Sequence, residues 1–126
     1  MAFPSAVIGI TALKKKLSQY VDRYDHDDKF VPVGFKVDFD SDFLRETWFA
    51  VGDKYGPGSY IFNCSWDIRA DVAKMICRCG LRLPNYKLST ICEHFGISLK
   101  GAHDALVDIK GTRELALLTE NYLRRN

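Results

Sequence analysis

The sequence predicts one α/β domain in which helices outnumber strands. Two observations support this prediction. Segments with apolar residues at helical spacing alternate with two short apolar runs typical of strands, and no internal repeat or low-complexity stretch interrupts that order. The 126 residues, 47% of them hydrophobic, are enough to bury a single core. We therefore expect residues 1–126 to form one domain with few strands and about five helices.

The helices are predicted from the period of the apolar residues and from residues that favour helix ends. In chain order, the expected helices are one capped by Thr11, one capped by Asp40 or Ser41, one over Asp67 to Cys79, one over Leu88 to Phe95 ended by Gly96, and one from about Asp104 to Arg124. The apolar runs Phe30 to Phe35 and Tyr60 to Phe62 are expected to form short strands between the first three helices.

The charge balance excludes one class of nucleic-acid-binding protein. The formal net charge is only +2, so the chain does not coat nucleic acid by bulk electrostatics. Any contact with nucleic acid must therefore come from a local site. The run Lys14 to Lys16 is best explained as the solvated face of the first helix.

The N-terminal segment has the wrong order for a secretory signal, because its short apolar run precedes the lysines. No apolar run approaches the length of a membrane span. We therefore expect a protein that stays in the cytoplasm and does not contact a membrane.

The four cysteines are expected to be buried free thiols. Cys64, Cys77, Cys79 and Cys92 lie inside apolar segments, and their only close pair has the spacing C-x-C rather than C-x-x-C. The histidines are scattered along the chain. This arrangement favours neither a disulfide framework nor a zinc site.

The last helix begins with a pattern that suits proton transfer and metal binding. If Asp104 caps this helix, His103 lies just outside it and is free to swing, whereas Asp108 projects from a rigid frame one turn beyond the cap. A mobile proton acceptor beside a fixed carboxylate suits metal-assisted hydrolysis. Taken alone, these residues are explained better by a capped helix with a surface histidine.

Three longer segments decide between these interpretations. The segment from Asn85 to Asp108 reads NYKLSTICEHFGISLKGAHDALVD, the segment from Val33 to Leu44 reads VGFKVDFDSDFL, and the segment from Ile8 to Thr11 reads IGIT. They resemble, in that order, the closing helix with its A-H-x-A-x-x-D motif, the N-x-x-F-D-x-x-F-L motif and the H-G-I-T turn of the DEDDh 3′ to 5′ exonucleases. The resemblance covers nearly the whole chain, although Lys36 stands where the family usually has asparagine.

The resemblance implies a ribonuclease-H-like exonuclease fold and two-metal phosphodiester hydrolysis. In the family, an aspartate and a glutamate from a D-x-E strand, with one aspartate from each later motif, hold two Mg²⁺ or Mn²⁺ ions, and a histidine takes the proton of the attacking water. By resemblance, Asp40 and Asp108 are metal ligands and His103 is the general base. The implied substrate is the 3′ end of DNA, with RNA as the alternative, and no residue is assigned to nucleic-acid binding.

One motif of the family has no match here. No aspartate is followed two residues later by glutamate, and the family's D-x-E strand should precede the segment from Ile8, where only seven residues remain. We therefore expect a truncated fold that holds Mg²⁺ weakly. The acidic stretch Asp25 to Asp28 and the residues Asp38 and Asp42 on either side of Asp40 are explained better by solvated turns and helix capping than as substitute ligands. His94 is explained better by packing or by the helix dipole.

Two functions stay open from the sequence. The chain is either an exonuclease-like hydrolase, incomplete and weakly active or inactive alone, or a catalytically dead remnant that serves as a nucleic-acid-binding or protein-binding module or as an inhibitor. Without the first strands, Phe30 to Phe35 is expected to form an open strand edge. Either a second copy or another chain pairs with this edge, or Ala6 to Ile8 folds back to cover it.

Overall fold

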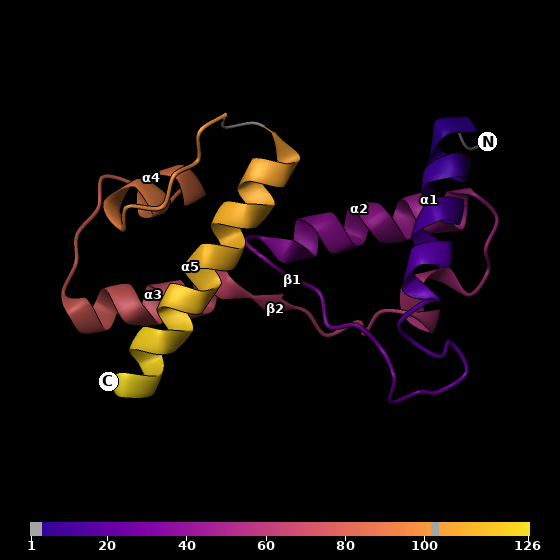
Figure 1. Cartoon of the computed structure of the whole chain (residues 1–126), viewed down its shortest axis with the longest axis horizontal. Coiled ribbons are helices and arrows are strands. Elements are labelled where there is room, and N and C mark those ends of the chain that lie inside the picture. Colours follow the sequence, from indigo (N-terminus) through magenta and orange to yellow (C-terminus); the bar gives the residue numbers. More distant parts are fainter. Residues whose placement is uncertain (1–3, 102–103) are drawn as a thin grey trace. The chain divides into compact units, whose positions relative to one another are not determined.

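The structure, a computed structural model, describes residues 4–101 and 104–126 (Figure 1). These residues form two compact units. Unit 1 comprises residues 4–33 and 37–66, and unit 2 comprises residues 34–36 and 67–126. The chain therefore passes between the units near residues 34–36 and again at residue 67.

The described residues are mostly helical with a small β component. In chain order the elements are α1 (Pro4–Leu17), β1 (Val33–Gly34), α2 (Val37–Ala50), the 3₁₀ helix η1 (Gly56–Ser59), β2 (Trp66–Asp67), α3 (Ile68–Cys79), α4 (Leu88–His94) and α5 (Ala105–Arg125). The two strands are parallel neighbours in one sheet. The predicted mixture of a few strands and five helices is confirmed, whereas the ribonuclease-H-like arrangement stays a prediction. Within this described part, no helix is long and apolar enough to span a membrane.

Unit 1 is held together by an apolar cluster that joins α1 to α2. Ile10 of α1, Trp48 of α2 and Tyr60 after η1 are buried, and Trp48 is 0% exposed. At the edge of this cluster, the Asp53 carboxylate accepts hydrogen bonds from the Lys14 ammonium at 2.7 Å and from the Trp48 indole N–H at 3.0 Å. The only polar atom of the Trp48 side chain thus has a charged acceptor, as a buried indole requires.

α1 begins well before the predicted position. Pro4 is its first residue, which suits proline because the first N–H groups of a helix have no intrahelical partner. Thr11 lies inside the helix, so the prediction that it is an N-cap is wrong. The same helix contains Ala6 to Ile8, so these residues do not fold back as a strand over the edge at Phe30 to Phe35.

α2 also begins earlier than predicted, because Lys36 turns the chain before it. Lys36 has a φ of 63°, and its backbone N–H donates to the Asp67 carboxylate at 3.1 Å. The buried Val37 is then the first residue of the helix. Asp40 and Ser41 are therefore helical residues, and the prediction that one of them is the N-cap is wrong.

The first predicted strand, Phe30 to Phe35, pairs over a shorter length than expected. Phe30 forms an isolated parallel bridge with Ile61. The Phe30 N–H donates to the Tyr60 carbonyl, and the Phe62 N–H donates to the Phe30 carbonyl, each at 2.9 Å. The second predicted strand, Tyr60 to Phe62, takes part in this bridge only, and the regular strand after it is β2.

Pro32 explains why the pairing is interrupted. It has no N–H, so it contributes only its carbonyl, which accepts from the Trp66 N–H at 2.8 Å. A proline inside a strand removes one hydrogen bond of the ladder. Regular strand geometry therefore remains only at Val33–Gly34, after the proline.

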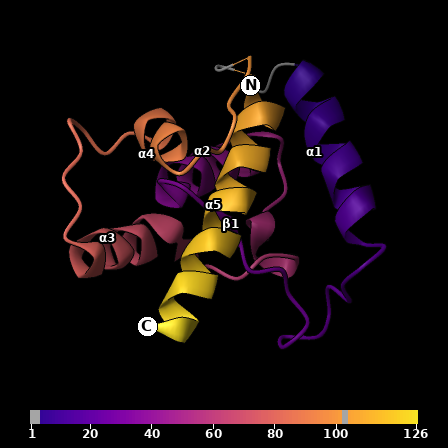
Figure 2. The same cartoon turned by 60° about the vertical axis from the view of Figure 1, so that its left-hand side comes forward.

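Unit 2 is a group of three helices, in which α3 and α4 both pack against α5 (Figure 2). Ile68 of α3, Ile91 of α4 and Leu115 of α5 are buried in its core. Gly111 allows α5 to come close to the segment after α4, because a Cβ at this position would meet the Leu99 side chain. A larger residue would therefore have to displace Leu99 from its place against α5.

The helix ends predicted in unit 2 are confirmed. Asp67 caps α3 by accepting from the Arg69 N–H at 3.1 Å, and Asp104 caps α5 by accepting from the Leu106 N–H at 2.9 Å. Gly96, with a φ of 73°, follows the end of α4. Left-handed glycine is favoured at this position because it has no Cβ to clash.

The prediction of buried cysteines is wrong at three of the four positions. Cys64, Cys77 and Cys79 are exposed free thiols, and Cys92 is a buried free thiol. The period of α3 turns Cys77 and Cys79 away from the core that Ile76 enters. Burial raises the pKa of the Cys92 thiol to about 11, so this thiol stays protonated at neutral pH.

We expect Asp53→Asn to destabilise the chain at neutral pH but not at strongly acidic pH. Hydrogen bonds from Lys14 and Trp48 lower the pKa of the Asp53 carboxyl from 3.8 to about 2. Because the folded pKa lies below the unfolded one, the stabilisation is fully present above the unfolded value and is lost as the pH falls through the folded value. Chemical denaturation at pH 7 should show a loss of about 1–2 kcal/mol.

The control for this measurement is Asp42→Asn, on an exposed position of α2. It should leave the free energy of unfolding nearly unchanged at both pH values. An equal loss for Asp53→Asn at pH 7 and near pH 2 would contradict the role assigned to the Asp53 charge.

Candidate functional site

Asp40 lies in the first turn of α2, and its side chain is exposed. Near a helix N-terminus, unpaired N–H groups and the helix dipole favour negative charge. Asp38 occupies the same turn. The helix therefore holds the Asp40 carboxylate on a fixed backbone, as a metal ligand requires, although the residue is not the cap that the sequence suggested.

Asp108 has the corresponding position in α5. It lies in the first turn and is half-buried, and its N–H donates to the Asp104 carbonyl at 3.1 Å. The Asp104 side chain caps this turn, as predicted, so Asp108 projects from a capped helix. His103 lies outside the described residues, and its role as general base stays a prediction.

Among the described residues, neither unit taken alone contains a complete metal centre. Asp40 belongs to unit 1 and Asp108 to unit 2. Across residues 4–101 and 104–126, no three His, Cys, Asp or Glu side chains form a group that could hold a metal ion. Carboxylate oxygens are the ligands that Mg²⁺ prefers, so the two aspartates fit the metal in kind but not in number. A complete centre would need both aspartates and further ligands.

Other residues considered as metal ligands have local roles. In the loop after α1, the Asp28 carboxylate accepts from the Asp22 N–H at 2.7 Å, which closes a turn. His94 is exposed at the end of α4, and its ring meets the Phe95 ring edge-on, with the centroids 4.9 Å apart. These observations agree with the predicted solvated loop and packing role.

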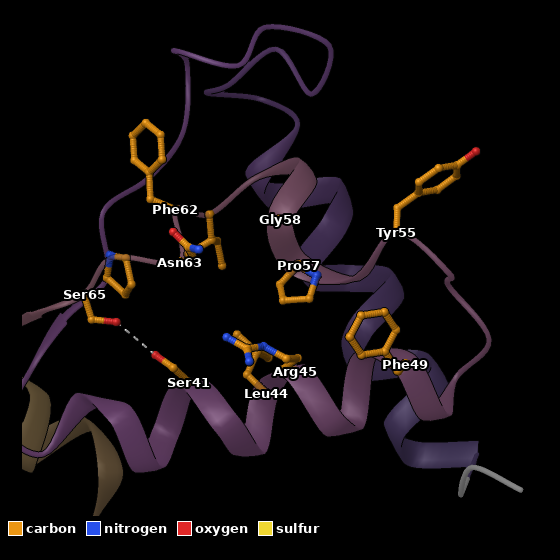
Figure 3. Close-up of a pocket in the computed structure, with 12 residues that line it drawn as sticks. Ser41, Leu44, Arg45, Phe49, Tyr55, Pro57, Gly58, Phe62, Asn63 and Ser65 are labelled. Carbon is orange, nitrogen blue, oxygen red and sulfur yellow. Dashed lines mark hydrogen bonds between the residues drawn. The ribbon is translucent and has the colours of Figure 1, made fainter.

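Unit 1 contains a pocket of about 340 Å³ that the sequence analysis does not identify (Figure 3). One wall is the face of α2 that carries Ser41, Arg45 and Phe49. The facing wall is formed by residues 55–65, the segment that follows α2 and contains η1. The pocket therefore exists only because α2 folds against the segment that follows it.

One end of this pocket is fixed by a close contact between a ring and a glycine. Gly56 has a φ of +63°, and a Cβ on it would lie 2.6 Å from the end of the Phe49 ring. Only glycine therefore allows the Phe49 ring to reach the start of η1. The Pro57 ring faces Phe49 across this end (Figure 3).

The polar groups occupy the other part of the pocket. The Ser41 and Ser65 hydroxyls lie 3.4 Å apart, and the Arg45 side chain on α2 faces the segment that carries Asn63 (Figure 3). Arg45 is the one charged residue in the lining. In the described part of the chain, neither the Arg45 side chain nor the Asn63 side chain has a hydrogen-bond or ion-pair partner.

Sequence reasoning missed Arg45 and Asn63 because neither belongs to a recognised motif. The one available signal is the spacing of Ser41, Arg45 and Phe49, which puts all three on one face of a helix. That spacing does not reveal which segment covers the face.

Unit 2 has a pocket of about 460 Å³ beside α3. Its lining is largely apolar and includes Val72, Ile76 and Leu81. Arg69 at this pocket is already paired with the Asp67 carboxylate at 2.9 Å. Arg82, the other arginine of this lining, is exposed. Of these two pockets, that of unit 1 is the one that combines an arginine with serine and asparagine side chains.

The comparisons with protein families, with curated proteins and with solved structures found no match for this chain. The resemblance to the DEDDh exonucleases therefore rests on the motif residues themselves.

If Asp40 and Asp108 share a metal centre, Mn²⁺ should act on both helices at once. A paramagnetic ion broadens the NMR signals of nearby nuclei, so substoichiometric Mn²⁺ should broaden amide signals at the starts of α2 and α5 together. Asp40→Asn should then reduce the broadening at both helices, because each divalent ion needs several carboxylate oxygens. The control Asp42→Asn should retain it, and broadening confined to one helix would reject the shared centre.

Proposed function

We propose that this chain carries two carboxylate motifs of a DEDDh-type 3′ to 5′ exonuclease and acts on nucleic-acid 3′ ends. The observation that supports this most directly is the position of the two motif aspartates. Asp40 and Asp108 each lie in the first turn of a helix of 14 and 21 residues, respectively. Ligands of a catalytic metal must be held on rigid elements, and both residues meet that condition.

In this proposal, Asp40 and Asp108 hold Mg²⁺ or Mn²⁺, and His103 accepts a proton. The bound ions would supply the charge that orients the attacking water and the leaving 3′ oxygen. The two aspartates keep their carboxylates on fixed backbones. His103 precedes the Asp104 cap, where it can receive the proton of the water as a general base.

By itself, the chain should be a poor nuclease. It contains no D-x-E pair, and two carboxylates cannot neutralise and orient two divalent cations against an incoming phosphate. Further ligands would have to come from another segment or from a partner chain. The second candidate function is a binding module without catalysis. The pocket with its unpaired Arg45 side chain favours this function, because a ligand could bind there without a metal ion.

We expect the purified chain to trim single-stranded 3′ ends much more slowly than about 1 per second, even with ample Mg²⁺ or Mn²⁺. Residual cleavage should disappear in Asp108→Asn, because that variant removes a metal ligand. It should fall by roughly 10²-fold or more in His103→Ala, since general-base catalysis contributes on that scale. A gel assay with a 5′-labelled oligonucleotide measures these rates.

The matched control is Glu114→Gln, which removes an exposed carboxylate from the same helix as Asp108. Glu114→Gln should keep the residual cleavage. Cleavage that is also unchanged in Asp108→Asn and His103→Ala would come from a contaminating nuclease. Trimming at about 1 per second or faster by the unmodified chain would show that the site is complete, against the proposal.

We also propose a partner-binding edge along Phe30 to Phe35. Phe30 and Pro32 direct backbone groups toward residues 60–66. Because the backbone groups of successive residues in a strand point to opposite sides, the N–H and C=O of Val31 point away from residues 60–66. Val31 has no backbone hydrogen bond within the described part of the chain, and it is 51% exposed. An edge of this kind is a template for another strand, and a second copy of the chain is the proposed occupant.

Light scattering should therefore report a mass near twice the 14.4 kDa of one chain. Val31→Lys should shift the equilibrium toward monomer, because a lysine on an edge strand opposes pairing. The control Val7→Lys changes an exposed valine on α1 and should not affect the mass. A monomer at every concentration tested would reject self-association through this edge.

A further inference from the structure

We infer that the pocket of unit 1 is a binding site for single-stranded nucleic acid, with a phosphate at Arg45 and a base against the aromatic rings of the lining. The inference rests on the proposed function, which supplies a nucleic-acid substrate. It goes further by naming the groups that hold the strand. Phe49, Arg45, Asn63 and the Ser41 and Ser65 pair are the residues concerned.

The charge of the pocket favours an anion. Arg45 is its one charged lining residue, and no acidic side chain lines it. Asp42 and Glu46 lie on the same helix but outside the lining. A guanidinium without a carboxylate partner has its N–H donors free, and its planar fork matches two oxygens of a phosphate.

The hydrogen-bonding groups suit the same ligand. The two serine hydroxyls share one long contact of 3.4 Å, so each keeps further donor or acceptor capacity. The Asn63 amide has no partner within the described residues. Arginine, serine and asparagine side chains are the usual contacts to phosphate and sugar oxygens, and an amide can also bond to a base edge.

Aromatic side chains supply the remaining element of the site. Phe49 is 47% exposed and Phe62 is 37% exposed, and both belong to the lining. Bases stack favourably on such rings, and this stacking does not depend on base identity. A purely apolar ligand could use these rings, but it would bury the Arg45 and Asn63 side chains without hydrogen-bond partners, which is unfavourable.

The position of the pocket connects it to the proposed metal ligand Asp40. Ser41 of the pocket directly follows Asp40 on α2, and both belong to unit 1. A strand whose phosphate binds Arg45 would therefore pass near Asp40. Stacking on the rings requires unpaired bases, so the expected substrate is a single strand and not a duplex.

The test is fluorescence anisotropy with the full chain, excess EDTA and a labelled oligothymidylate of about eight nucleotides, a length within the usual site size. We expect saturable binding that Arg45→Gln weakens by roughly 10-fold or more, with a smaller dependence on salt. The matched control is Arg82→Gln, which removes an exposed arginine of the unit 2 pocket and should leave the affinity unchanged. Oligouridylate of equal length shows whether DNA or RNA binds more tightly, and binding of either one that depends on Arg45 supports the site.

Several outcomes would overturn the inference: no binding, equal affinity for a duplex, no effect of Arg45→Gln, or the same loss in Arg82→Gln. If Arg45→Gln does not fold, amide shifts caused by the oligonucleotide in the unmodified chain decide the question. Shifts at residues 41–49 and 61–65 support the site, and shifts confined to unit 2 reject it.

The EDTA separates this test from catalysis. Binding in EDTA that depends on Arg45, together with cleavage that Asp108→Asn does not reduce, would support the pocket and reject the proposed nuclease. Metal-dependent cleavage that Arg45→Gln does not affect would support the nuclease and reject the pocket.

Discussion

The arrangement of unit 1 depends most on the hydrogen bonds that the Asp53 carboxylate accepts. This carboxylate joins three segments by accepting from Lys14 of α1, from Trp48 of α2 and from the Tyr55 N–H at 3.1 Å in the turn before η1. Charge-assisted bonds of this kind are stronger than neutral ones, and Trp48 is fully buried beside them. The C-terminal half of α2 is thereby fixed. The same helix carries Asp40 and Arg45, so the proposed metal ligand and the pocket are supported by one element.

The helix ends that the sequence predicted correctly are those determined by local chemistry. Asp67 and Asp104 cap their helices with bonds to residues two positions ahead, and Gly96 supplies the left-handed turn that ends α4. The failures arise where the decisive partner is distant or the conformation unusual. Lys36 has a positive φ, which cannot be predicted from a lysine in the sequence. Pro32 interrupts the hydrogen bonds to a segment that lies about 30 residues further along the chain.

The candidate site likewise has features that depend on local sequence and features that depend on distant contacts. The rigid position of Asp108 followed from a local cap, whereas the pocket required α2 to meet residues 55–65, which no short-range pattern encodes. From sequence, Arg45 looks like any solvated cation on a helix. The role proposed for Arg45 follows from the segment that it faces, which carries Asn63, and from the lack of a carboxylate in the lining.

The two tryptophans of the chain, Trp48 and Trp66, both belong to unit 1. Unit 2 therefore contains no tryptophan, and the emission of the fully buried Trp48 reports on unit 1. Far-ultraviolet circular dichroism, in contrast, reports on the helices of both units. The two signals, recorded on the same unlabelled sample, would show whether the units unfold in one step or in two.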